Sequence, residues 1–192
     1  MSQPSTSELR MVDRNVFLIG MPATGKSTVG RLLGKLLGCE FFDSDEEIES
    51  RSGAAVSWIF DVEGEAGFRE REHQVLRELT QMKGVVVATG GGAVLREENR
   101  ELLRSRGTVV WLDSSDKRIQ ARTSKDSKRP LLGGADGTAT IARLRAERTP
   151  LYESTADFSV VTDKQPARSV AKHIVSELKR LLAPLEQPGS RR

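Results

Sequence analysis

The sequence predicts a single α/β domain with a parallel sheet of about five strands and helices on both faces. Strand and helix signals alternate along the whole chain, and no repeat or interdomain linker interrupts them. A glycine-rich loop of the phosphate-binding type follows the first strand. The 192 residues suffice for one domain, and a composition of 37% apolar and 30% charged residues is typical of a globular protein.

Local patterns predict the first elements in order. The apolar run at residues 16–19 is typical of a strand. A helix is expected behind it because apolar side chains recur at helical spacing: Val29, Leu32, Leu33, Leu36 and Leu37. Residues 40–43 form a short expected strand, and Ser44 and Glu47 have the spacing of a capping box for the next helix.

The remaining elements continue the alternation. Ser57 is expected to cap a short turn, before a longer helix over about residues 64–82. The apolar run at residues 85–88 predicts a strand buried on both faces. The rest of the chain predicts a helix near 97–106, a strand at 108–112, helices near 115–122 and 138–153, a strand near 158–161, and a helix over about 167–182.

Residues 20–28 fit the pattern G-x-x-x-x-G-K-[ST] of a phosphate-binding loop. Glycines let the backbone fold tightly around an anion, and N–H groups at the start of the following helix point at phosphates. Lys26 can reach the β- and γ-phosphates, and the Ser27 hydroxyl can bind Mg²⁺. A glycine turn with an unrelated lysine is the alternative, but the strand before and the helix behind favour nucleoside triphosphate binding.

Asp43 and Asp45 close the second predicted strand. Residues two apart on an extended chain face the same way, so both carboxylates are expected to point into one cleft. One could hold Mg²⁺ directly or through water, and the other could accept a hydrogen bond from a substrate hydroxyl. The alternative is that one aspartate only caps the next helix.

Two arginines and a glycine run are candidates for a second binding site. The three glycines at 90–92 cost roughly 0.5–1 kcal/mol each relative to alanine, which a ligand lying against bare backbone would explain. Glu72 lies three residues after Arg69 and could orient it, although a solvated helix face is the alternative. Arg69 and Arg148 would form a carboxylate site if they converged, which spacing alone leaves open.

A polar, basic and glycine-containing segment at about residues 124–137 has no apolar periodicity. In a nucleotide kinase such a loop would be a lid that excludes water and brings an arginine to the transferring phosphoryl group. The alternative is a solvated surface loop.

Composition and termini exclude several classes of protein. The net charge of +3 comes from 30 basic and 27 acidic residues that are interleaved, so it does not require nucleic acid. A single cysteine, Cys39, excludes an internal disulfide and fits a reducing compartment. Residues 1–14 lack the apolar core of a signal peptide, and no apolar run approaches membrane-spanning length. We expect a cytoplasmic protein with flexible tails at 1–14 and 184–192.

Together these segments resemble the shikimate kinase family over nearly the whole chain, from residue 15 to 182. The specific combination is the D-x-D at 43–45, the triple glycine, Phe68-Arg69, Arg129-Pro130-Leu131-Leu132, and Arg148 before Pro150-Leu151-Tyr152. The resemblance implies a kinase domain over 15–183, with a P-loop NTPase fold of nucleoside-monophosphate-kinase type and strand order 2-3-1-4-5. It implies transfer of the γ-phosphoryl group of ATP to the 3-hydroxyl of shikimate, in aromatic amino-acid biosynthesis. We expect a monomer with one Mg²⁺ per active site and no nucleic-acid or membrane partner.

For the nucleotide, the resemblance implies that the phosphates are cradled by Ala23, Thr24, Gly25, Lys26, Ser27 and Thr28. Ser27 would bind Mg²⁺, with Asp43 behind the water shell of the ion. Arg122 would stack near the adenine, and Gln165 would fall in the adenine loop. Arg129 would come from the lid onto the phosphates.

For shikimate, the resemblance implies that Asp45 holds the ring hydroxyls, including the attacking one, as a positioning base. Arg69 and Arg148 would bind the carboxylate. The ring hydroxyls would also contact the backbone of Gly90, Gly91 and Gly92. The catalytic residues would then be Lys26, Asp45 and Arg129.

Two rival functions belong to different classes. Another small-metabolite kinase of similar fold, such as a gluconate kinase, is disfavoured by the arginine pair and the triple glycine. A non-catalytic sensor of shikimate-like ligands would be favoured by loss of Lys26, Asp45 or Arg129, all of which are present.

Overall fold

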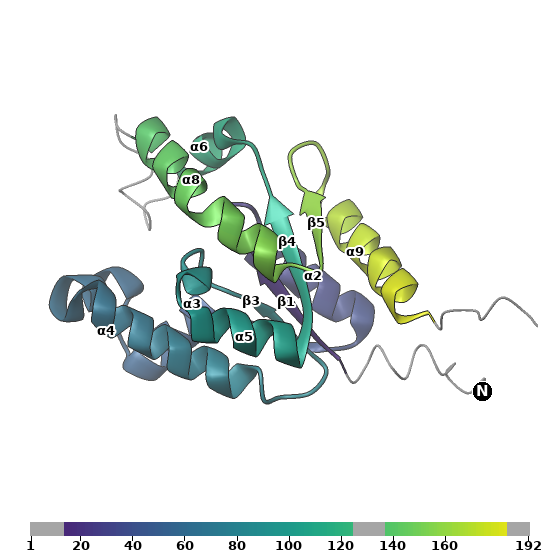
Figure 1. Cartoon of the computed structure of the whole chain (residues 1–192), viewed down its shortest axis with the longest axis horizontal. Coiled ribbons are helices and arrows are strands. Elements are labelled where there is room, and N and C mark those ends of the chain that lie inside the picture. Colours follow the sequence, from purple (N-terminus) through teal and green to yellow (C-terminus); the bar gives the residue numbers. More distant parts are fainter. Residues whose placement is uncertain (1–13, 125–136, 184–192) are drawn as a thin grey trace, which may run out of the picture.

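A computed structural model describes residues 14–124 and 137–183 of the chain. Its centre is a parallel five-stranded sheet of order β2-β3-β1-β4-β5, shown in Figure 1. From one edge to the other, the strands are β2 (Glu40–Asp43), β3 (Val85–Ala88), β1 (Asn15–Ile19), β4 (Gly107–Asp113) and β5 (Phe158–Val161). The predicted fold class and strand order are confirmed.

Alternate side chains of the central strand β1 enter two separate cores. Val16 and Leu18 pack in one core, and Phe17 and Ile19 pack in the other. All five residues of β1 are buried, because helices cover both faces of a parallel sheet. This alternation places the end of β1, and the loop that follows it, between the two helical layers.

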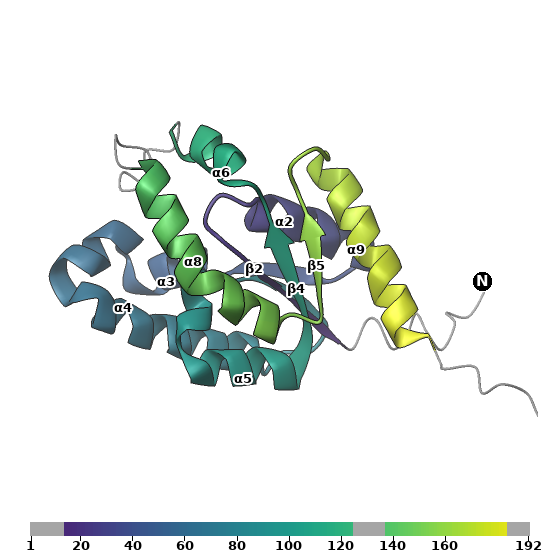
Figure 2. The ribbon, with the colours of Figure 1, turned by 45° about the horizontal axis from the view of Figure 1, so that its top comes forward.

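Two layers of helices cover the sheet, as Figures 1 and 2 show from different sides. One face is covered by α2 (Lys26–Leu37) and α9 (Ala167–Leu182). The other is covered by α4 (Val56–Leu79), α5 (Glu97–Arg106) and α8 (Gly137–Thr155). The predicted bounds of α5 and α9 are confirmed, and α8 is longer than the predicted 138–153.

Three short helices follow strands at their carboxyl ends: α3 (Ser44–Ser52) after β2, η1 (Ala93–Leu95) after β3, and α6 (Asp116–Thr123) after β4. The capping box predicted for α3 is wrong. Asp43 is the cap, and its side chain accepts a hydrogen bond from the Asp45 N–H at 3.0 Å. Ser44 instead lies within the helix, with its hydroxyl bonded to the N–H of Gly90 at 2.9 Å.

The predictions for the start of α4 are also corrected. The helix begins at Val56, whose N–H donates to Glu49 Oε1 at 3.0 Å, so Ser57 lies inside the first turn and is not the cap. Gly64 has φ of 72° and ψ of −179°, which interrupts the helical geometry where a separate helix was predicted to start. The second arm of α4 ends at Leu79, before the predicted residue 82.

Several predictions concern residues that the structure does not describe. The tails predicted at 1–14 and 184–192 lie outside the described residues, apart from Arg14, and most of the lid predicted at 124–137, including Arg129, lies outside them too. Within residues 14–124 and 137–183, no helix is long and apolar enough to cross a membrane.

Candidate active site

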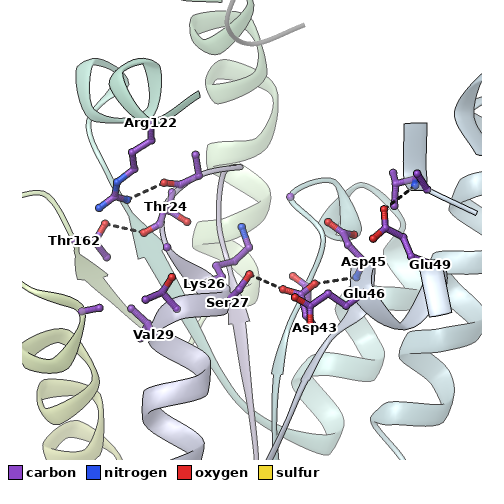
Figure 3. Close-up of a pocket in the computed structure, with 18 of the residues that line it drawn as sticks. Thr24, Lys26, Ser27, Val29, Asp43, Asp45, Glu46, Glu49, Arg122 and Thr162 are labelled. Carbon is purple, nitrogen blue, oxygen red and sulfur yellow. Dashed lines mark hydrogen bonds between the residues drawn. The ribbon is translucent and has the colours of Figure 1, made fainter. Parts of the chain in front are cut away.

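A cavity of about 1070 Å³ lies at the carboxyl ends of the strands (Figure 3). This is where open parallel sheets bind ligands. Its walls include eleven of the predicted site residues: Ala23, Thr24, Gly25, Lys26, Ser27, Thr28, Asp43, Asp45, Gly91, Arg122 and Gln165. The lining does not include Arg69, Arg148, Gly90 or Gly92, and Arg129 lies outside the described residues.

The phosphate-binding loop has the backbone conformation that an anion cradle needs. Ala23 has φ of 62° and Gly25 has φ of 98°, both in the left-handed region that lets successive N–H groups turn toward one point. Gly20 is required for a second reason, because a Cβ there would lie 2.3 Å from the backbone oxygen of Leu112. No side chain caps the first N–H groups of α2.

The side chain of Lys26 lies across this loop and is held by backbone oxygens of the loop. Its ammonium donates to the backbone oxygens of Gly20 at 2.8 Å and Met21 at 2.9 Å. The side chain is therefore buried over the loop with its charge at the cavity, as Figure 3 shows. A phosphate seated in the loop would meet a cation that is already in position.

Ser27 and Asp43 join the start of α2 to the end of β2. The Ser27 hydroxyl donates to Asp43 Oδ2 at 2.5 Å, while Asp43 Oδ1 caps α3. The capping alternative for Asp43 is therefore confirmed, and its role near Mg²⁺ stays a prediction. Two hard oxygen atoms beside a phosphate loop fit Mg²⁺, which usually takes one or two carboxylates and completes its shell with water and phosphate. Within the described residues, no group of three or more His, Cys, Asp or Glu side chains is arranged to hold a metal ion.

At the far end of the cavity, the wall comes from α6 and from the segment after β5. Arg122 donates to the backbone oxygen of Ala23 at 2.8 Å, and its pKa is lowered by burial and by the charge of Arg118. Thr162 donates to the backbone oxygen of Thr24 at 3.1 Å. Gln165 and two apolar residues of α9, Ala167 and Val170, complete this end.

Asp45 reaches the cavity by a route that differs from the predicted one. Asp43 ends β2, but Asp45 already belongs to the first turn of α3, so the two do not share an extended segment. Both nevertheless line the cavity, because the chain turns into the helix at its rim. Asp45 Oδ1 lies close to Gly90, where a Cβ would come within 2.9 Å of it and within 2.4 Å of Glu72 Oε1.

Glu72 is a fully buried carboxylate on α4 and orients Arg69, as its spacing predicted. Its Oε2 accepts from Arg69 Nη1 at 2.8 Å, and Arg69 also donates to the exposed Glu65 at 3.1 Å. Burial raises the pKa of Glu72 to about 7, the charge of Arg69 opposes this shift, and the charge of Asp45 adds to it. The Arg69 guanidinium lies against Gly92, where a Cβ would be 2.3 Å from Nη2.

Arg148 lies on α8 and is buried, with 9% of its surface exposed. Its positive charge lowers the pKa of Glu72 and of Tyr152, although burial leaves the pKa of Tyr152 raised above its ordinary value. Arg69 and Arg148, on two different helices, therefore both lower the pKa of the same buried carboxylate, and Arg69 is also bonded to it. That the two guanidiniums form one carboxylate-binding site stays a prediction.

Four residues that help to build the site were not predicted as site residues: Ser44, Glu49, Tyr152 and Thr162. The first and third hold the glycine turn, through the Gly90 N–H at 2.9 Å and the Gly91 oxygen at 2.6 Å. Glu49 caps α4 from the cavity wall, and Thr162 holds the phosphate loop. Thr162 directly follows a strand, so the rule on carboxyl ends could have identified it.

Comparison with known proteins gives a consistent answer. The family model for shikimate kinase matches residues 22–179. A shikimate kinase of Buchnera aphidicola subsp. Schizaphis graminum is 52% identical over 169 residues, which are 88% of this chain and 98% of that protein. One from Chromohalobacter salexigens is 53% identical over 171 residues, or 89% and 95% of the two chains.

Solved structures agree with the sequence comparison. The shikimate kinase of Acinetobacter baumannii in complex with shikimate has a TM-score of 0.86 at 43% identity, and the match covers 91% of this chain and 98% of that one. The shikimate kinase of Aquifex aeolicus has a TM-score of 0.77 at 37% identity, over 88% and 98% of the chains. A gluconokinase from Sinorhizobium meliloti, at 17% identity and a TM-score of 0.55, shares the fold alone. The chain belongs to the shikimate kinase family.

Proposed function

We propose that this chain transfers the γ-phosphoryl group of ATP to the 3-hydroxyl of shikimate, giving shikimate 3-phosphate and ADP. The observation that carries the proposal is one cavity in which a phosphate-binding loop and a Ser27–Asp43 oxygen pair stand beside Asp45. Arg69 is bonded to the buried carboxylate of Glu72, and the charges of Asp45 and Arg148 both act on the pKa of that carboxylate. One part of this arrangement suits a nucleotide, and the other suits a small hydroxylated acid.

In the proposed nucleotide site, the backbone of residues 23–28 binds the phosphates and Lys26 neutralises charge on the β- and γ-phosphates. One Mg²⁺ would be held by Ser27, with Asp43 behind its water shell, and would supply charge neutralisation to the phosphates. Arg122 and Gln165 flank the adenine. Arg129 is assigned to the phosphates by the resemblance alone, because it lies outside the described residues.

In the proposed shikimate site, the planar forks of Arg69 and Arg148 bind the carboxylate of the substrate. Asp45 accepts a hydrogen bond from the attacking hydroxyl and holds it in line with the γ-phosphorus. Because phosphoryl transfer passes through a loose transition state, positioning and charge neutralisation outweigh the basicity of Asp45.

In this proposal the glycine turn does more than expose its backbone to the substrate. The Gly90 N–H already donates to Ser44, so it is not offered to a ring hydroxyl as the resemblance implied. Glycine at 90 and 92 also leaves room for protein groups, namely the carboxylates of Asp45 and Glu72 and the guanidinium of Arg69. We propose that the turn contacts shikimate through Gly91 and Gly92 and serves at Gly90 to let these carboxylates approach.

A coupled assay of ADP release tests the proposed function. Shikimate should support turnover with MgATP, whereas quinate, gluconate and nucleoside monophosphates should support little. Turnover with gluconate and not shikimate would select the rival kinase, and tight shikimate binding without ADP release would select the sensor. The monomeric state, the cytoplasmic location and the lack of a nucleic-acid partner remain predictions.

A further inference from the structure

We propose that Asn99 is a positioning residue for the second substrate. Through hydrogen bonds to His73 and to the backbone of Ala93, it sets the distance between the glycine turn (residues 90–92) and Arg69. The inference rests on the proposed function, because the turn and Arg69 are two walls of the proposed shikimate site. Asn99 itself touches neither the cavity lining nor Arg69 in any contact described above.

Asn99 is fully buried near the start of α5 and uses both ends of its amide. Nδ2 donates to the Ala93 oxygen at 3.0 Å, and Oδ1 lies 2.7 Å from His73 Nδ1. A carbonyl oxygen only accepts, so Ala93 fixes which way the amide points. Oδ1 must then face His73, and the Nδ1 of His73 must carry the proton.

On one side, this amide holds a segment that is continuous with the glycine turn. The Ala93 N–H donates to the Gly90 oxygen at 3.1 Å, and the Leu95 N–H donates to the Gly92 oxygen at 3.0 Å. Arg100, the next residue of α5, donates to the oxygens of Val94 at 2.6 Å and Leu95 at 3.2 Å. Three consecutive carbonyls of η1 are therefore held by two neighbouring side chains of α5.

On the other side, His73 is the residue after Glu72, which holds Arg69. The guanidinium of Arg69 already touches Gly92, where a Cβ would be 2.3 Å from Nη2. Because Gly92 and the guanidinium are tightly packed, a shift of the turn relative to α4 would move the guanidinium or open a gap beside it. The two hydrogen bonds of Asn99, to His73 and to Ala93, therefore connect α4 to η1. The spacing of these two elements decides the contact between Gly92 and Arg69.

A leucine at position 99 would have the same number of side-chain heavy atoms, branched at the same carbon, and would bury more apolar surface, so core filling does not require an asparagine. The amide adds direction, since it accepts from one element and donates to the other. A positioning role predicts a selective loss of shikimate affinity when the amide is removed. A purely structural role predicts a loss of stability that leaves both ligands bound as before.

The test compares the dissociation constants of shikimate and MgADP, measured by calorimetry at a temperature where circular dichroism shows each variant folded. Asn99→Leu should weaken shikimate binding about tenfold and change MgADP binding less than twofold. His73→Phe, which removes one of the two bonds, should weaken shikimate binding about threefold. Leu103→Ala is the matched control: it creates a cavity on the same helix and should lower the melting temperature with shikimate affinity unchanged.

The outcomes separate the two proposals. If the wild type binds no shikimate, the proposed function fails. If the wild type binds shikimate and Asn99→Leu binds it equally well, the positioning role is overturned, as it is if both ligands weaken together. Should Asn99→Leu fail to fold, His73→Phe decides, and unchanged shikimate affinity in that variant overturns the inference.

Discussion

The two halves of the cavity are built in different ways. In the nucleotide half, charged and polar side chains bond to nearby backbone or to each other: Lys26 to its own loop, Arg122 to Ala23, and Ser27 to Asp43. In the substrate half, charged groups are crowded and buried. Among the described residues, Glu72 Oε1 and Arg148 Nε are buried there without a hydrogen-bond partner.

This difference shows where each half obtains its affinity. A loop whose own backbone holds the lysine is preformed. When a phosphate binds, its oxygens only have to replace the backbone oxygens that accept hydrogen bonds from Lys26. A buried cation with an unused donor, such as Arg148 Nε, is costly to the fold and becomes better satisfied when a complementary anion arrives. Variants in the first half should therefore affect turnover, and variants in the second should affect shikimate affinity and stability.

The largest effect is expected at Lys26, and it tests whether the nucleotide half acts on turnover. Lys26→Ala should lower kcat roughly a thousandfold or more, because it removes the cation between the β- and γ-phosphates. Its circular dichroism spectrum should be unchanged. Lys35→Ala, an exposed lysine on the same helix, is the control. Normal turnover in folded Lys26→Ala would contradict the assignment of the phosphate loop.

The next effect concerns Arg129. Arg129→Ala should lower kcat about a hundredfold and raise the shikimate KM much less, which is how loss of a contact made only in the transition state appears. Steady-state kinetics with both substrates varied measures the two constants. Hydrogen exchange gives a second readout, since amides of residues 125–137 should gain protection when ADP and shikimate are both bound. A near-normal kcat with equal protection in the two states would remove this segment from the mechanism.

In the substrate half, Arg69→Lys keeps the charge and loses the planar fork. Shikimate affinity should fall by about 1.5–3 kcal/mol, while ATP affinity should hardly change. Arg71→Lys is a matched control, because Arg71 pairs with Glu63 on the exposed side of the same helix. Equal weakening of ATP binding in Arg69→Lys would mean that the two halves are not separate.

The smallest expected effect tests whether the buried carboxylate of Glu72 destabilises the fold of the substrate half. The pKa of Glu72 is raised from 4.5 to about 7, so the folded protein keeps a proton that the unfolded chain loses. The contribution of Glu72 to the unfolding free energy must then fall as pH rises from about 4.5 to about 7. Glu72→Gln removes this titration, so its stability relative to wild type should improve between pH 5 and 8, on the order of 2 kcal/mol.

Denaturant titrations of both proteins at several pH values measure this difference, and the other titrating groups cancel in the comparison. A difference that is constant with pH would show that Glu72 is ionised in both states. Shikimate affinity of Glu72→Gln should fall as well, since Arg69 loses the charge that orients it.

The sequence predicted the nucleotide half more completely than the substrate half, for a physical reason. The phosphate loop is contiguous, and its glycines, lysine and serine lie within a few residues of each other in the sequence. The substrate half is assembled from α3, α4, α8 and the glycine turn. Whether Arg148 meets Arg69 depends on how α4 and α8 pack on the sheet, and spacing along the chain does not contain that information.

Two of the errors concern helix caps. Ser44 has the right spacing for a cap, but Asp43 lies one residue earlier and its second oxygen faces Ser27, so the aspartate serves both neighbours. Ser57 was predicted to cap a turn, but Glu49 of the preceding helix accepts the hydrogen bond from the first N–H of α4. At α4 a side chain from another helix formed the bond that the local rule gave to Ser57, whereas the cap of α3 is still local and lies one residue before Ser44.

The glycine turn also has a consequence for inhibitor design. A side chain added at 90, 91 or 92 would come within 2.4 Å of Glu72, 2.8 Å of Pro22 or 2.3 Å of Arg69, respectively. Each of these neighbours belongs to the site, so a substitution that pushed an inhibitor away would first displace the enzyme's own groups. An inhibitor that draws its contacts from this wall would face a narrow route to drug resistance, because mutations that evict it would also damage turnover.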